Sequence, residues 1–396
     1  MIISILGTSG AFFDSKECLP QRDDEGNIKF QSAKYDSELL GKESGNYKNS
    51  TEFLLESFDD DFVFIGTKCA INFQKIILAD SIKKKRVIYE IVEDDSLDDI
   101  FEKILSLIQS SDKILLDITH GFRHQPIMAI FASTLSQFLD GRDLKIIFAK
   151  EINQFEEYRY IYLNEYIEIT QISLLLTGFI RTLNFIPVTN MSFLDNKVFE
   201  DFSKSLLSND ILGVERNYLL LKDELKRLQD NQELKHISTL IIKAQKELKS
   251  LDMLPFFEAY QKYMVLSKLM IEKNYLIVSL AYIFEALREY CSYRFRDVCR
   301  DIKFKDEYER NDNVMKTIGN FKPQNKILSR NHALYNKNKK TFTRVNELYN
   351  RIRKRRNALA HINQTKNFVS IKEDLNQIII DVEQLFNQEV LKSIYL

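Results

Sequence analysis

The stretch "KILLDITHGFRHQP" (residues 113–126) places an apolar run directly before a turn that is rich in hydrogen-bond donors. The run "KILLDI" (113–118) has the near-continuous aliphatic character of a strand that is buried on both faces of a sheet. The stretch "PIMAIFASTLSQFL" (126–139) has helical spacing, and its leading proline suits the first turn of a helix. Strand, turn and helix in this order predict one unit of a parallel α/β sheet.

The same alternation extends over the first 165 residues or so. Helical patterns at 50–58, 70–82 and 96–109 separate further strand-like runs. These runs are "IISIL" (2–6), "FVFIG" (62–66), "RVIYEIV" (86–92), "LKIIFAK" (144–150) and "YRYIYL" (158–163). We therefore expect a Rossmann-like, doubly wound α/β domain with right-handed crossovers. Residues 14–50 are polar and break the pattern, which indicates an irregular excursion or a hairpin.

The remainder of the chain lacks strand signals and is rich in leucine, lysine and glutamate at helical spacing. We expect an all-α C-terminal part, with further helices near 341–362 and 371–393, and a linker at "FIPVTNMS" (185–192). The expected domains are 1–168, a helical linker region at 169–252, and 253–396. The apolar positions predicted to form the helical core are Phe256, Tyr260, Tyr263, Leu266, Leu269, Leu276, Leu280, Ile283 and Leu287.

Composition places the chain among ordinary globular proteins, with 44% hydrophobic and 29% charged residues. The formal net charge of −1 gives no overall field that would attract nucleic acid, so any basic surface must be local. We see no signal peptide, and no apolar run reaches the ~18 residues that a membrane span needs. These features predict a cytoplasmic protein that does not bind a membrane.

The four cysteines are Cys18, Cys69, Cys291 and Cys299. None is arranged as CxxC, and none is spaced with a histidine as in a zinc site, so the sequence predicts no metal. In a cytosolic chain we expect all of them to be reduced thiols.

Donor-rich turns follow three of the predicted strands: "GTSG" (7–10), "GTK" (66–68) and "DITHGFR" (117–123). In an open doubly wound sheet, ligands bind beyond the carboxyl ends of the strands. Glycine lets backbone approach a ligand, hydroxyls donate hydrogen bonds, and guanidinium can grip a phosphate with two donors. The candidate ligand residues are Gly7, Thr8, Ser9, Gly10, Thr67, Lys68, Thr119, His120, Gly121 and Arg123. Together they favour a nucleotide or phosphodiester pocket.

Plainer interpretations stay open. "GTSG" could be an ordinary turn, and His120 and His124 could pack or cap locally without touching a ligand. The turns match neither the GxGxxG nor the GxxxxGK[ST] pattern, so neither a dinucleotide enzyme nor an NTPase is indicated.

"DITHGFR" matches a DxTHG motif, and together with "GTSG" it resembles the CARF sensor domains of proteins from type III CRISPR systems. The resemblance covers mainly residues 1–165. It implies a Rossmann-like fold that pairs in a homodimer and whose strand-end loops hold a ring of linked adenylates. By that resemblance Thr8, Ser9, Thr119, His120, Gly121 and Arg123 would line the ring's pocket. A two-fold symmetric ring also suits an isologous dimer site.

A basic segment runs from Arg330 to His361, with ten lysines or arginines against one acid, Glu347. Such a run could be a solvated helix face. It ends, however, in "RNALAH" (356–361), which resembles the Arg-x4-His signature of HEPN ribonucleases, helical domains that cut RNA without metal. The resemblance implies Arg356, Asn357 and His361 as catalytic residues. HEPN proteins often carry a polar residue on a preceding helix, and Glu285 or Arg288 could fill that place, although both could be ordinary surface charges.

The chemistry of these side chains agrees with that resemblance. RNA carries its own nucleophile, the 2′-hydroxyl, so a site needs a proton acceptor or donor and a cation for the crowded phosphorane. Histidine titrates near neutral pH and arginine supplies the cation, while Asn357 could orient the phosphate or the histidine. Five residues on a regular helix correspond to about 140° of rotation. One helix does not easily aim Arg356 and His361 at one point, which favours a composite site in a dimer.

The sequence thus predicts an endoribonuclease of type III CRISPR antiviral defence that a cyclic oligoadenylate activates, without metal or cofactor, and that cuts single-stranded RNA to a 2′,3′-cyclic phosphate. Two alternatives remain. The chain could be a cyclic oligoadenylate-binding regulator with no ribonuclease activity. It could also be a ring nuclease in which His120 or His124 helps to cut the adenylate ring.

Overall fold

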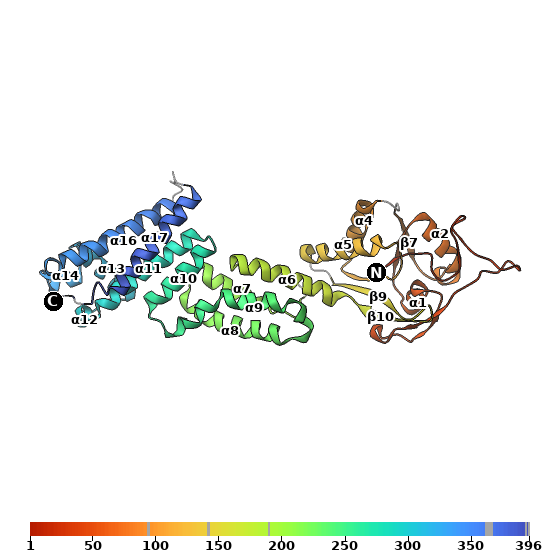
Figure 1. Ribbon diagram of the computed structural model, residues 1–396, viewed down its shortest axis with the longest axis horizontal. Coiled ribbons are helices and arrows are strands. Elements are labelled where there is room, and N and C mark those ends of the chain that lie inside the picture. Colours follow the sequence, from red (N-terminus) through yellow and green to blue (C-terminus); the bar gives the residue numbers. More distant parts are fainter. Residues whose placement is uncertain (93–95, 141–142, 189–190, 361–366, 393, 395–396) are drawn as a thin grey trace. The chain divides into compact units, whose positions relative to one another are not determined.

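The structure, a computed structural model, describes residues 1–92, 96–140, 143–188, 191–360, 367–392 and 394 (Figure 1). It contains two compact units, one formed by residues 1–174 and 187–196 and the other by residues 175–186 and 197–396. The first is an α/β unit and the second is all-helical in its regular structure, so the expected fold class is confirmed.

The first unit is built on an eight-stranded sheet with the order β5-β4-β10-β9-β8-β1-β6-β7. All six strands expected from the sequence are present within a few residues of their expected bounds. The strands are β1 (Ile2–Ile5), β4 (Ala33–Asp36), β5 (Gly45–Tyr47), β6 (Phe62–Gly66), β7 (Val87–Ile91), β8 (Lys113–Asp117), β9 (Asp143–Asn153) and β10 (Glu157–Tyr162).

Five strands, in the order β9-β8-β1-β6-β7, are mutually parallel. Counted along the chain, this is the Rossmann order, in which the winding direction reverses next to the first strand. The reversal lies between β1 and β8, where Ile3 is paired with Leu116 and Ser4 with Asp117. The loops that follow these two strands therefore flank the position at which such sheets bind ligands.

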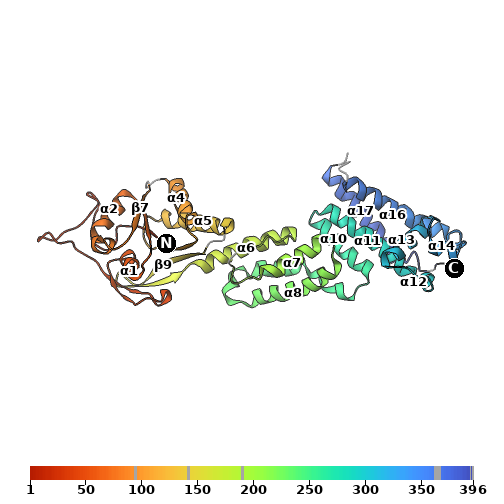
Figure 2. The same ribbon diagram turned by 180° about the vertical axis from the view of Figure 1, so that it is seen from behind.

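Alternate residues of the central strands enter two separate cores, because successive side chains of a strand point to opposite faces. Ile2 and Phe64 pack with α1 (Ser50–Ser57) and α2 (Lys68–Ile77) on one face. Ile3 and Ile65 pack with α4 (Leu97–Gln109) and α5 (His124–Asp140) on the other. Helices α4 and α5 lie side by side in both ribbon views (Figure 1, Figure 2).

The polar excursion at 14–50 forms more regular structure than the sequence indicated. A short hairpin of β2 (Phe13–Asp14) and β3 (Leu19–Pro20) is followed by β4 and β5, which extend the main sheet beyond β10. The 3-10 turn η1 (Glu38–Leu40) joins β4 to β5.

A disulfide joins Cys18, in the excursion, to Cys69 in the first turn of α2. The expectation of four reduced thiols was wrong for this pair and holds for Cys291 and Cys299, which are free and buried. The two bonded cysteines are 51 residues apart in sequence, yet their Cα atoms are 5.3 Å apart because the hairpin folds back onto α2. The sequence carried no signal for this approach.

The second unit consists of helices around an apolar core, and α6 (Asn164–Thr182) passes from the first unit into it. The expected linker at 185–192 has no helix or strand among its described residues. The helical elements are α7 (Asn196–Leu207), α8 (Ile211–Asp230), η2 (Gln232–Ile237), α9 (Ser238–Glu247), η3 (Lys249–Phe256), α10 (Ala259–Glu272), α11 (Leu276–Arg294), α12 (Arg296–Cys299), α13 (Glu307–Ile318), α14 (Lys326–Arg330), α15 (Leu334–Lys337), α16 (Lys339–Ala360) and α17 (Phe368–Asn387).

Helix α11 is central in this core and packs against α10, α13, α16 and α17. Helices α16 and α17 run side by side (Figure 2). Most expected core positions are buried or partly buried in this core, but Phe256 is 79% exposed. It ends η3 before α10 begins at Ala259, so it does not share the buried face of α10. Within the described residues, no helix is long and apolar enough to span a bilayer.

Candidate functional site

The loops after β1 and β8 meet beyond the carboxyl edge of the sheet. Ser9 Oγ lies 3.2 Å from His120 Nε2, a hydrogen-bond distance between the two loops. A Cβ on Gly7 would stand 3.0 Å from the Gly121 nitrogen, so the backbones are also in close contact. The structure therefore brings together four of the residues that the sequence singled out.

Gly121 is required by its conformation as well as by its surroundings. Its φ is +99°, which side-chain-bearing residues rarely adopt. A Cβ there would lie 2.5 Å from Ile5 Cγ2 and 2.6 Å from Gln125 Oε1. The glycine of the THG sequence is thus explained by chain reversal against β1, with or without a ligand.

A buried carboxylate organises the start of the same turn. Asp117 is fully buried and accepts hydrogen bonds from Ser4 Oγ and Ser50 Oγ, each at 3.0 Å. It also accepts from the backbone N–H and the hydroxyl of Thr119. The Thr119 hydroxyl in turn accepts from the Ala149 N–H of β9 at 2.9 Å. The hydroxyl of Thr119 therefore links the turn to the sheet, because it is hydrogen-bonded to both Asp117 and Ala149.

Two side chains that the sequence did not single out hold the loop after β1. Gln74 Nε2 donates to the carbonyl oxygens of Gly7 and Ser9, at 2.6 and 3.0 Å. Asn49 Nδ2 donates to Ser9 O and to Gln74 Oε1, both at 3.0 Å. Both side chains are buried. The sequence gives no signal for the role of Gln74, which lies within an expected helix. Asn49 could have been identified as an N-cap residue, because it directly precedes an expected helix.

The remaining ligand candidates differ in whether their side chains already make hydrogen bonds within the protein. The Thr67 hydroxyl accepts a hydrogen bond from the Ala70 N–H, so Thr67 is the N-cap residue of α2. Thr8 is half-buried, Lys68 is exposed in the first turn of α2, and Arg123 is exposed directly before α5. These last three side chains make no hydrogen bond or ion pair with the part of the chain that the structure describes. Within the described residues, their donors at this edge are therefore available to a ligand.

The two histidines of the turn have different surroundings. Burial lowers the pKa of His120, and the nearby negative charge of Asp117 opposes that effect. A neutral imidazole at pH 7 can donate from one nitrogen and accept at the other. The ring of His124 stacks on Phe122 with centroids 6.1 Å apart, and its Nε2 is buried without a partner among the described residues.

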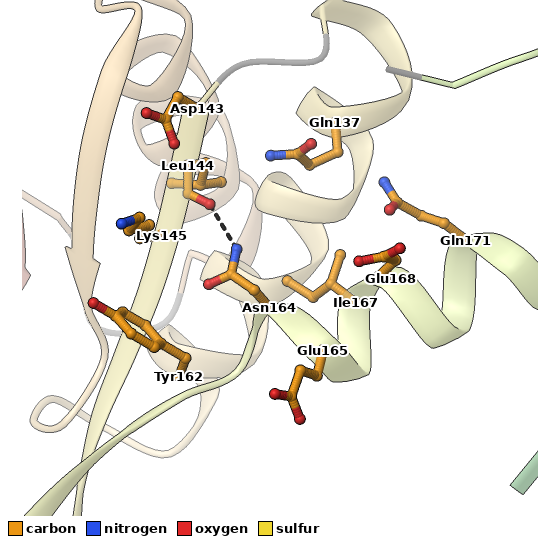
Figure 3. A pocket seen from close by; sticks show the side chains of 10 residues that line it. All are labelled: Gln137, Asp143, Leu144, Lys145, Tyr162, Asn164, Glu165, Ile167, Glu168 and Gln171. Atoms are coloured by element: carbon orange, nitrogen blue, oxygen red, sulfur yellow. Dashed lines mark hydrogen bonds between the residues drawn. The ribbon is translucent and has the colours of Figure 1, made fainter. Parts of the chain in front are cut away.

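A cavity of about 590 Å³ lies at the opposite edge of the sheet, between the start of β9 and α6 (Figure 3). Its lining includes Asp143, Lys145, Tyr162 and Gln171 and none of the predicted ligand residues. Asn164 closes part of its wall by donating to Leu144 O at 2.6 Å, the dashed bond in Figure 3. Open parallel sheets bind ligands at the carboxyl edge, and this cavity lies at the other edge.

The second predicted site lies in the helical unit. Arg356 and Asn357 occupy the last turn of α16, and Asn357 is exposed. His361, the third predicted catalytic residue, lies outside the described residues. The structure therefore places two members of the predicted triad on one helix end, and the third position stays a prediction.

The cations of α16 fall into two groups. Arg351 pairs with Asp381 at 2.5 Å and with Asp374 at 3.5 Å, and Arg355 also pairs with Asp374, so the side of α16 that faces α17 is neutralised. Arg356 has no hydrogen bond or ion pair with the described part of the chain. The exposed Arg353 and Lys354 share this property. The sequence showed one basic run, and the fold leaves only part of it unpaired.

Helix α11 presents aromatic and charged groups to this helix end. The Arg356 guanidinium lies 4.2 Å from the centroid of the Phe284 ring, which stacks on Tyr349 of α16. Arg288, whose side chain is 11% exposed, pairs with Glu285 at 3.0 Å. Arg288 is therefore mostly buried near the predicted site, unlike an ordinary surface charge. Sequence reasoning raised Glu285 and Arg288 and missed Phe284, because an apolar residue in an apolar helix gives no signal.

Among the residues that the structure describes, no group of three or more histidine, cysteine, aspartate or glutamate side chains is placed to hold a metal ion.

No family model matches the sequence, and no curated protein matches it. Among solved structures, the chain is similar to Enterococcus italicus Csm6 bound to cyclic hexa-2′-fluoro-hexa-dAMP, at 12% identity. The match covers 99% of this chain and 98% of that chain, with a TM-score of 0.36.

Proposed function

We propose that this protein is an endoribonuclease that a cyclic oligoadenylate activates and that cuts single-stranded RNA without a metal ion. The ring would bind across the loops after β1 and β8, and Arg356, Asn357 and His361 would form the cleavage site. The motif resemblance to CARF and HEPN domains supports both assignments and suggests a role in type III CRISPR antiviral defence.

The observation that carries this proposal is the unpaired guanidinium of Arg356 beside neutralised neighbours. Arg351 and Arg355 are neutralised by Asp374 and Asp381, whereas Arg356 keeps all its donors free within the described chain. A guanidinium with uncommitted donors suits an anion with several oxygens, such as an RNA phosphate.

The cleavage step follows from RNA chemistry. The 2′-oxygen forms a bond to the adjacent phosphorus while the bond from phosphorus to the 5′-oxygen breaks. The 2′-hydroxyl loses a proton and the 5′-oxygen gains one, so the products are a 2′,3′-cyclic phosphate and a 5′-hydroxyl. His361 would move one of these protons, and Arg356 would stabilise the negative charge of the phosphorane.

For the N-terminal site, the supporting geometry is a donor-rich edge next to the switch point of the sheet. Thr8, Lys68 and Arg123 offer free donors there, and Ser9 and His120 join the two loops. Lys68 stands in the first turn of α2, where the partial positive charge of the helix also favours an anion. A phosphodiester ring fits these groups.

We also propose that the protein acts as a homodimer. An apolar stripe of Ile127, Phe131, Leu135 and Leu139 runs along α5, each residue four positions after the last, and each is between 39% and 60% exposed. Residues four apart share one helix face, so this face is suited to burial against a second copy. A dimer would also supply two copies of Arg356 and His361 for one composite site.

A ring nuclease in the first unit is the second candidate function. The observation that favours it is the contact between Ser9 Oγ and the depressed-pKa imidazole of His120, because a neutral imidazole can accept a proton from a nearby hydroxyl. Loss of the ring that persists in His361→Ala would support it. A regulator without ribonuclease activity has no observation of its own in its favour, and it predicts that no RNA is cut.

The test incubates labelled single-stranded RNA with the purified protein and EDTA, alone and with rings of three, four or six adenylates. We expect cleavage with one ring size, 2′,3′-cyclic phosphate ends, and loss of activity in Arg356→Ala and His361→Ala. Arg351→Ala is the matched control, since Arg351 is on the same helix but neutralised. Cleavage that is equal in all the variants would overturn the catalytic assignment, and no cleavage with any ring would overturn the function.

A further inference from the structure

Arg356 is held by an aromatic ring where its neighbours on α16 are held by carboxylates. Its guanidinium carbon lies 4.2 Å from the centroid of Phe284, well within the range of a cation–π interaction. Phe284 belongs to α11 and is 6% exposed. Among the described residues, this ring is the partner of the Arg356 side chain.

The ring itself is fixed from several sides. Tyr349 stacks on Phe284 with centroids 5.2 Å apart and planes 30° apart. Tyr349 and Arg356 are seven residues apart, about two helical turns, so both project from the same face of α16. Arg288, on α11 one turn after Phe284, lies 5.6 Å from the ring centroid and is itself anchored by Glu285. Phe284 therefore cannot turn away without disturbing packing on both helices.

A ring and a carboxylate hold a guanidinium in different ways. A carboxylate occupies the N–H groups at the edge of the guanidinium, as Asp374 and Asp381 do for Arg351. An aromatic face attracts the positive charge without accepting those N–H groups into ordinary hydrogen bonds. Holding Arg356 by a ring fixes its position, keeps its charge, and leaves its donors free for a phosphate.

We propose that Phe284 is a positioning residue that holds the Arg356 guanidinium by its aromatic face, ready to contact the RNA phosphate that is cleaved. The inference rests on the proposed ribonuclease function for its consequence in activity. The geometry of the pair can be tested without that function. Phe284 would act through Arg356 and would not touch the reacting atoms.

The experiment weakens the negative face of the ring while nearly keeping its shape. Phe284 is replaced by 4-fluoro-, 3,5-difluoro- and 3,4,5-trifluorophenylalanine, and separately by Phe284→Leu. Phe295, directly after the last residue of the same helix, is the matched control. It is fully buried, its ring centroid lies 5.7 Å from that of Phe342, and no cation of the described residues lies over it. Single-turnover cleavage and the Kd for a 2′-deoxy RNA analogue that cannot be cleaved are measured for each variant, with activator present.

We expect the cleavage rate to fall stepwise with fluorination at position 284, by roughly three- to tenfold for the trifluoro ring and for Phe284→Leu. In the fluorinated variants, which nearly keep the shape of the ring, the Kd and the thermal midpoint should change little, and the Phe295 series should leave the rate unchanged. A rate that stays flat over the Phe284 series, while the wild type cuts RNA and Arg356→Ala does not, would overturn the proposal.

A second readout keeps the proposal separate from the function. In the wild type, NMR signals of the Arg356 side chain, assigned through Arg356→Lys, should carry an upfield ring-current shift that disappears in Phe284→Leu. If the wild type cuts no RNA, the proposed function fails, and this shift alone decides whether Phe284 holds Arg356. The absence of a shift in the wild type would overturn the pairing.

Discussion

Ser9 Oγ and His120 Nε2 lie 3.2 Å apart although the two residues are separated by 111 positions in the sequence. The contact closes the gap between the loops after β1 and β8, at the switch point of the parallel sheet. The contact holds the Ser9 hydroxyl and the His120 imidazole at the position where this type of sheet binds a ligand. The two groups could exchange a proton or contact the same ligand there.

The stability of the protein should depend on the titration of His120. Burial lowers the pKa of His120 in the folded state, whereas the unfolded chain has a value of about 6.5. As the pH falls below that value, the unfolded state binds a proton that the folded state does not, so stability is lost. The thermal midpoint of the wild type should fall more steeply below pH 6.5 than that of His120→Gln. Parallel curves for the two proteins would contradict a lowered pKa.

Gly121→Ala should destabilise the protein by about 3 kcal/mol, through a strained φ together with a clash in the core. Its Cβ would stand 2.5 Å from Ile5 Cγ2. Gly26→Ala is the matched control, because Gly26 also has a positive φ, +86°, but has nothing within 4 Å of the added atom. It should cost about 1 kcal/mol in the same denaturant titration. Equal losses in both variants would show that packing against Ile5 contributes nothing.

The disulfide between Cys18 and Cys69 should be detectable by thiol counting. Denatured, unreduced protein should titrate two thiols, Cys291 and Cys299, out of the four cysteines, and all four should react after reduction. A crosslink over 51 residues should contribute up to about 4 kcal/mol by restricting the unfolded chain. A reducing agent should therefore lower the thermal midpoint of the wild type and leave that of Cys18→Ser unchanged. Four reactive thiols before reduction would exclude the bond.

The two groups of cations on α16 should respond differently to removal. Arg353 and Lys354 are exposed and unpaired within the described chain, so Arg353→Ala and Lys354→Ala should weaken RNA binding. Each should reduce the slope of log K against log salt by about 0.7 if it contacts a phosphate of single-stranded RNA. Arg351→Ala should leave that slope unchanged and cost about 1 kcal/mol of stability through its lost ion pairs. The same slope in all three variants would contradict this division.

Sequence reasoning identified the fold class and six strands because their signals are local. A run such as "FVFIG" and the helix pattern after it each occupy one continuous stretch, and Rossmann order follows from how such units pack. The same reasoning placed Ser9, His120 and Gly121 at one edge, since parallel strands end together.

What could not be predicted depends on contacts between distant segments. The disulfide joins residues 51 positions apart. Gln74 donates a hydrogen bond to the loop after β1, and nothing in the sequence of its helix predicts that contact. The basic run gave no sign that Asp374 and Asp381 would neutralise Arg351 and Arg355. Phe284 has the sequence pattern of a core residue, and its contact with the Arg356 guanidinium depends on how α11 packs against α16.

The central claim is that a ligand at the first unit controls chemistry in the second. The most direct test is the ratio of the RNA cleavage rate with cyclic oligoadenylate to the rate without it, measured in EDTA for the wild type and for Arg123→Ala. We expect a ratio of about 100 or more for the wild type, equivalent to a coupling of roughly 3 kcal/mol or more, and a ratio near one for Arg123→Ala at the same ring concentration. A wild-type ratio of one for every ring size, or full stimulation in a variant that no longer binds the ring, would contradict the account.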